Sequence, residues 1–90
     1  MKTLQDYQNL KTELETIKAN HKETYLDASW ICVRPINMNW REAKKIGCKK
    51  DYYWGWIFYS TSTNSNGNEL YNKIKETCKG FDMYVNERLI

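Results

Sequence analysis

The chain has 90 residues, which is the length of one domain, and we expect residues 1–90 to fold as a single unit. A hydrophobic content of 41%, with four Gly and one Pro, excludes a disordered or fibrous chain. The net charge of +3 is modest for a nucleic-acid binder, and the lack of an 18-residue apolar run excludes a membrane-spanning helix.

Residues 3–21 are predicted to form a helix that begins with a capping box, because Asp6 follows Thr3 at the required spacing. Apolar residues recur every three or four positions and form one stripe: Tyr7, Leu10, Leu14 and Ile17. We expect this stripe to pack on a sheet of the same chain. A homodimer through residues 3–21, as a short coiled coil, is the alternative, although the stripe has fewer than three clean heptads.

The next two predicted elements are a strand and a short helix. β-Branched and aromatic residues cluster between Trp30 and Val33, and Pro35 closes the run, which predicts a strand over residues 24–36. Asn39 is placed to cap the following helix, and Gly47 is placed to end it. On this helix of about two turns we expect one face to carry Trp40, Ala43 and Ile46.

The sequence DYYWGWIFYS, residues 51–60, is predicted to be a second strand, with alternate side chains on opposite faces. We expect Gly55 to mark the close approach of a helix or of another backbone segment, and the face with Gly55 to be covered. That face also holds Tyr53, Ile57 and Tyr59. The opposite face is then a candidate exposed platform of four aromatic residues: Tyr52, Trp54, Trp56 and Phe58.

A polar loop is expected at residues 60–68, with a turn at Asn66-Gly67. A helix is predicted over residues 68–80, with Leu70, Ile74 and Cys78 on its apolar face, and a last strand over residues 81–90. The resulting order, α-β-α-β-α-β, predicts an α+β two-layer sandwich of about three strands and three helices. Both links between strands contain a helix and are therefore long enough for parallel crossovers.

The positive charge is concentrated next to the aromatic run. Residues 41–51 hold five basic and two acidic side chains and carry the whole net excess of +3. The basic ones are Arg41, Lys44, Lys45, Lys49 and Lys50.

Two functional interpretations follow from the aromatic platform and its basic rim. Trp, Tyr and Arg anchor protein interfaces, and a positive rim attracts an acidic surface, so a protein partner is our first expectation. The alternative is a single-stranded nucleic acid (RNA), whose bases would stack on the rings while lysines contact its phosphates. The predicted contact residues in both cases are Tyr52, Trp54, Trp56, Phe58, Arg41, Lys44, Lys45, Lys49 and Lys50.

The sequence contains no motif for catalysis, metal binding or a cofactor, so we expect a non-enzymatic protein. Three widely spaced cysteines without a CxxC pair indicate reduced thiols, and with no secretory leader in the sequence they predict a cytoplasmic protein. The richness in Trp, Tyr, Asn and Lys is similar to that of small phage or mobile-element proteins. We therefore expect a stoichiometric inhibitor or adaptor with a host-takeover or anti-defence role, anti-CRISPR-like in character.

Overall fold

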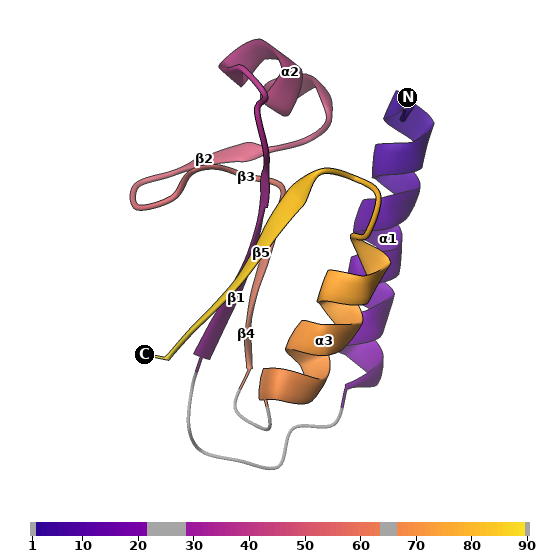
Figure 1. The fold of residues 1–90 in the computed structure, drawn as a ribbon, viewed down its shortest axis with the longest axis vertical. Helices are drawn as coiled ribbons and strands as arrows, with labels where there is room; N and C mark the ends of the chain where they lie inside the picture. The colour runs from indigo at the N-terminus through magenta and orange to yellow at the C-terminus, as the bar shows by residue number, and fades with distance from the viewer. Residues whose placement is uncertain (1, 22–28, 64–66, 90) are drawn as a thin grey trace.

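The predicted α+β class is confirmed, with three helices and five strands in the part of the chain that the computed structural model describes, residues 2–21, 29–63 and 67–89 (Figure 1). In chain order the elements are α1 (Leu4–Asn20), β1 (Ser29–Pro35), α2 (Trp40–Lys45), β2 (Lys49–Asp51), β3 (Gly55–Ile57), β4 (Tyr59–Thr63), α3 (Gly67–Thr77) and β5 (Met83–Leu89).

The strands form two antiparallel sheets. The larger sheet has the order β4-β1-β5, and β2 pairs with β3 in a separate hairpin. Because both outer strands are antiparallel to β1, β4 and β5 run in the same direction and α3 connects them across the sheet. A parallel crossover from β1 to the next strand does not form. Helix α2 is about 9 Å long, too short to return the chain along a seven-residue strand of roughly 23 Å.

The helix caps form as the sequence predicts. The Asp6 backbone N–H donates to Thr3 Oγ1 over 3.1 Å, and the Thr3 N–H donates to Asp6 Oδ2 over 2.8 Å, which completes the capping box of α1. Asn39 caps α2 by accepting the N–H of Glu42 over 2.9 Å. Gly47 follows α2 with a φ of +99°, a backbone conformation that favours glycine.

The hydrophobic core lies between the larger sheet and the two long helices, which cover the same face of that sheet (Figure 1). Ile31 and Val33 of β1 are completely buried there. The helices contribute two apolar stripes: Tyr7, Leu10 and Leu14 from α1, and Leu70 and Ile74 from α3, which Cys78 continues directly after the helix. Since the α1 stripe is covered within the chain, a homodimer through residues 3–21 would have to use another face of the helix.

The predicted strand over residues 51–60 is wrong in detail, because the chain reverses inside it. Residues 52–54 form a turn between β2 and β3, and β4 begins only at Tyr59. The expected close approach at Gly55 is also wrong, since a Cβ built there would meet no atom within 4 Å. Gly55 instead has a φ of +78°, so it serves the turn through its backbone freedom.

Two smaller expectations also need correction. Trp40 does not join the covered face of α2 and is 55% exposed, whereas Ala43 is buried and Ile46 is partly buried. Residues 60–63 of the expected polar loop belong to β4, where they pair with β1. The predicted strand at residues 24–28 and the turn residue Asn66 lie outside the described residues.

Candidate functional site

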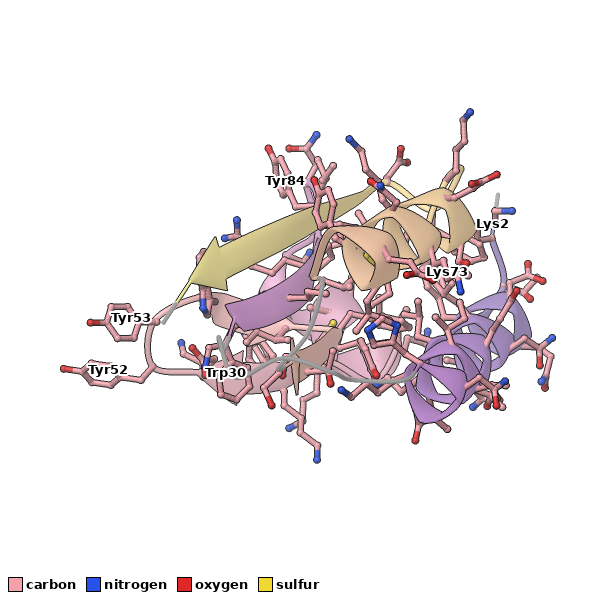
Figure 2. All side chains as sticks on the ribbon, turned by 90° about the horizontal axis from the view of Figure 1, so that it is seen from below. Lys2, Trp30, Tyr52, Tyr53, Lys73 and Tyr84 are labelled. Carbon is pink, nitrogen blue, oxygen red and sulfur yellow. The ribbon has the colours of Figure 1, made fainter. Side chains whose placement is uncertain are left out.

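The tip of the β2–β3 hairpin is held by one carboxylate. Asp51 Oδ2 accepts the backbone N–H of Tyr53 over 2.8 Å and that of Trp54 over 2.9 Å. These two bonds fix the turn and leave the Tyr52 side chain 100% and the Tyr53 side chain 75% exposed. Figure 2 shows both rings projecting from the body of the protein. Their centroids are 6.1 Å apart in an edge-to-face arrangement.

The hairpin projects from the side of the larger sheet opposite to the helices (Figure 1). Side chains of β1 alternate, so that Ile31 and Val33 point to the core while Trp30, Cys32 and Arg34 point to the hairpin side. Trp30 is 45% exposed on this side. The antiparallel register places Tyr84 of β5 directly beside Arg34, and Tyr84 is 51% exposed.

A cavity of about 280 Å³ lies between the hairpin and this face of the sheet. Its lining combines side chains from the sheet and the hairpin: Trp30, Cys32, Asp51, Tyr53, Trp54, Ile57 and Ser60. Pockets for drug-sized ligands measure roughly 300–1,000 Å³. The volume therefore suits one side chain of a partner better than a cofactor.

Arg34 connects the cavity to the β5 side of the sheet. Its guanidinium carbon lies 4.8 Å from the centroid of the Trp54 ring and 5.4 Å from that of Tyr84. Both distances are within the range of cation–π contacts. We call the exposed and half-exposed group formed by these residues the aromatic surface: Trp30, Arg34, Tyr52, Tyr53, Trp54 and Tyr84.

The structure divides the four residues of the predicted platform. Tyr52 and Trp54 lie at the hairpin tip in the aromatic surface. Trp56 of β3 is half-buried against the core. Phe58 is only 2% exposed, its ring is 6.1 Å from that of Tyr7, and its backbone N–H donates to the Val33 carbonyl over 2.8 Å. A flat face containing all four side chains therefore does not exist, because the turn at residues 52–54 breaks the alternation.

The five predicted basic residues are all exposed, but none of them lines the 280 Å³ cavity. Arg41 contacts the ring of Trp40, with its guanidinium carbon 5.3 Å from the centroid. Lys44 and Lys45 lie in the last turn of α2. Lys49 and Lys50 line a different groove, between α1 and β2, which also includes Lys11.

Sequence reasoning missed four members of the aromatic surface, namely Trp30, Arg34, Tyr53 and Tyr84. The signal for the hairpin was present, because Asp51 and Gly55 are turn formers on either side of three residues. A second signal was present in β1. Ile31 and Val33 occupy every second position, so their larger or more polar neighbours Trp30 and Arg34 share the opposite face of the strand.

The remaining chemistry in the described residues is limited. Burial raises the pKa of the Cys32 thiol at the cavity to about 11, so that it is protonated at neutral pH. In residues 2–21, 29–63 and 67–89, no three His, Cys, Asp or Glu side chains gather as a metal site would require. The helices of this same part of the chain are too short or too polar to cross a membrane.

Comparisons with known proteins give no further guide to this surface. No protein-family model, no curated protein and no solved structure matches the chain.

Proposed function

We propose that the chain is a small, non-enzymatic protein-binding module that acts by occupying the surface of a partner, as a stoichiometric inhibitor or adaptor. The observation that carries this proposal is the exposure of Tyr52 and Tyr53 at the tip of an ordered turn, together with the half-exposed Trp30 and Tyr84 on the larger sheet. Tyr, Trp and Arg are the residues that dominate the energetics of protein interfaces. The composition supports an inhibitor of the kind made by phages and mobile genetic elements.

The core does not account for these side chains. Tyr7 and Phe58 pack edge to face inside the protein, while the rings at the hairpin tip remain in water. Exposed aromatic groups of this size, gathered on one side of a small domain, are typical of interaction sites.

The alternative, binding of single-stranded nucleic acid, requires several basic side chains beside the rings to contact the phosphates. In the aromatic surface, Arg34 is the one basic residue. The cavity beside the rings is lined by no lysine and contains the carboxylate of Asp51. Lys49 and Lys50 line the groove next to α1 instead. This separation favours a protein partner.

The test is affinity capture of the tagged protein from a lysate of the cells that make it, with and without nuclease. We expect one partner protein at equal stoichiometry in both arms. The double variant Tyr52→Ala/Tyr53→Ala should lose this partner while it keeps its far-UV circular dichroism and melting temperature. The matched control is Trp40→Ala, which removes a 55% exposed ring on α2 and should retain the partner.

Two results would contradict the proposal. If the double variant captures the partner as well as the wild type does, the aromatic surface is not the interface. If all captured proteins disappear after nuclease treatment, the primary ligand is a nucleic acid.

A further inference from the structure

The cavity and the Arg34 guanidinium lie next to each other on the same strand. Cys32, at the cavity, and Arg34 both point to the hairpin side of β1, two residues apart. Such neighbours on one face of a strand are roughly 6–7 Å apart. The Trp54 ring joins the two features, because it lines the cavity and also contacts the guanidinium.

Arg34 has hydrogen-bond donors without an acceptor in the described part of the chain. Its Nε–H is buried, and no acceptor contacts it within the described residues. The rings of Trp54 and Tyr84 hold the guanidinium but supply no hydrogen-bond acceptor. A guanidinium that contacts rings through its face keeps its N–H groups for an acceptor in the same plane. Because Nε is buried, the terminal Nη groups are the ones that the carboxylate of a ligand can reach.

Asp51, the acidic residue at the cavity, does not pair with Arg34. Asp51 Oδ2 already accepts two backbone N–H groups of the turn, and no ion pair joins Asp51 to Arg34 in the described part of the chain. The five basic side chains of residues 41–51 lie outside the cavity. Arg34 is therefore the cationic side chain that an acidic ligand at the cavity would meet.

We propose that the aromatic surface binds an extended segment of a partner protein in which an apolar side chain and a carboxylate are two residues apart. The apolar side chain fills the cavity between Trp30, Trp54 and Ile57, and the carboxylate pairs with Arg34. The spacing follows from the geometry, because side chains two residues apart in an extended segment lie on one face at the same roughly 6–7 Å separation. This inference rests on the proposed protein-binding function and specifies its ligand.

The experiment uses peptide probes of this pattern and the full ¹⁵N-labelled chain. The probes are acetyl-Leu-Ser-Glu-amide and its reverse, acetyl-Glu-Ser-Leu-amide, each compared at low salt with the peptide that contains Gln in place of Glu. We expect at least one Glu peptide to shift the backbone amides of Cys32 and Ile57 and the Nε–H of Arg34. We also expect it to bind at least fivefold more tightly than its Gln counterpart.

Variants of the chain assign this difference to one side chain. In Arg34→Gln the preference for Glu over Gln should disappear, while in Lys50→Gln, which removes a charge outside the cavity, it should remain. If Arg34→Gln does not fold, the comparison of the Glu and Gln peptides on the wild-type chain still decides the question.

Several outcomes would overturn the inference. These are equal affinity for the Glu and Gln peptides, a preference that persists in Arg34→Gln, and the absence of any shift at the cavity. If Arg34→Gln captures the cellular partner normally while Tyr52→Ala/Tyr53→Ala loses it, the protein-binding function stands and only the carboxylate pairing fails. If an oligothymidine displaces the peptide and binds more tightly, the ligand is a nucleic acid.

Discussion

At the scale of single residues, the backbone around each aromatic side chain decides whether it is buried. Phe58 is tied to β1 by the hydrogen bond from its N–H to the Val33 carbonyl, and its ring packs against Tyr7 in the core. Tyr52 lies only six positions earlier, in a turn that points into water, and is fully exposed. Residue type alone therefore does not separate the core from the aromatic surface.

The three thiols give a prediction at the same scale. Burial raises the pKa of Cys32, Cys48 and Cys78 to about 11 from 9.0. Between pH 9 and pH 11 the unfolded chain therefore loses thiol protons that the folded chain keeps. The free energy of unfolding should be unaffected by the thiols below pH 9 and should fall above it, by about 1 kcal/mol for each thiol at pH 10.

Urea denaturation at pH 8, 9 and 10, with a reductant present, measures this effect. Tyr7 and Tyr59, whose pKa values burial also raises from 10.0, contribute in the same direction at higher pH, which is why the series stops at pH 10. Cys78→Ala should show a smaller decrease than the wild type does. An unchanged free energy of unfolding between pH 8 and pH 10 would show that the thiols are not shielded from water.

At the scale of elements, the β2–β3 hairpin forms its own sheet, separate from the larger one. Its two strands pair with each other in a sheet of their own, and Asp51 holds its turn. The hairpin carries Tyr52, Tyr53 and Trp54, whereas β1 and β5 carry Trp30, Arg34 and Tyr84. The aromatic surface therefore depends on how the turn places the hairpin tip over the sheet.

The Asp51→Ala variant tests this dependence. Removal of the carboxylate leaves the N–H groups of Tyr53 and Trp54 without their acceptor and should destabilise the turn by about 1 kcal/mol. Hydrogen exchange at the amides of Trp54 and Trp56 should accelerate roughly fivefold, while exchange in β1 stays unchanged. Asp51→Asn, which keeps an acceptor oxygen, should have a smaller effect. Equal acceleration in β1 would mean that the hairpin and the sheet open together.

The elements with strong local signals were predicted from the sequence, and the hairpin was not. The apolar stripes of α1 and α3 and the caps at Thr3 and Asn39 are fixed by residues three or four positions apart, so the pattern is visible in the chain. The side chains of the run WGWIFY fit the alternating pattern of a strand. For this reason the turn between Asp51 and Gly55 was not predicted. The pairing of Arg34 with Tyr84 and Trp54 depends on sheet order, which local patterns do not contain.

At the scale of the whole molecule, the protein has two different sides. Helices α1 and α3 cover one face of the larger sheet and enclose the core, and the hairpin projects from the other side (Figure 1). The candidate site is therefore built by residues from β1, the hairpin and β5 together. Of the predicted contact residues, only Tyr52 and Trp54 belong to it, because the basic side chains are on α2 and on β2 outside the cavity.

Site-specific photo-crosslinking of the full chain, in the cells that make it, tests directly whether the aromatic surface is the interface. A photoreactive benzoylphenylalanine replaces Tyr52 in one sample and Lys73 in the other. Lys73 is an exposed residue of α3, on the helical side of the protein (Figure 2). We expect one discrete protein adduct from position 52 and none from position 73. An adduct from position 73 with none from position 52 would contradict the claim that the aromatic surface is the interface.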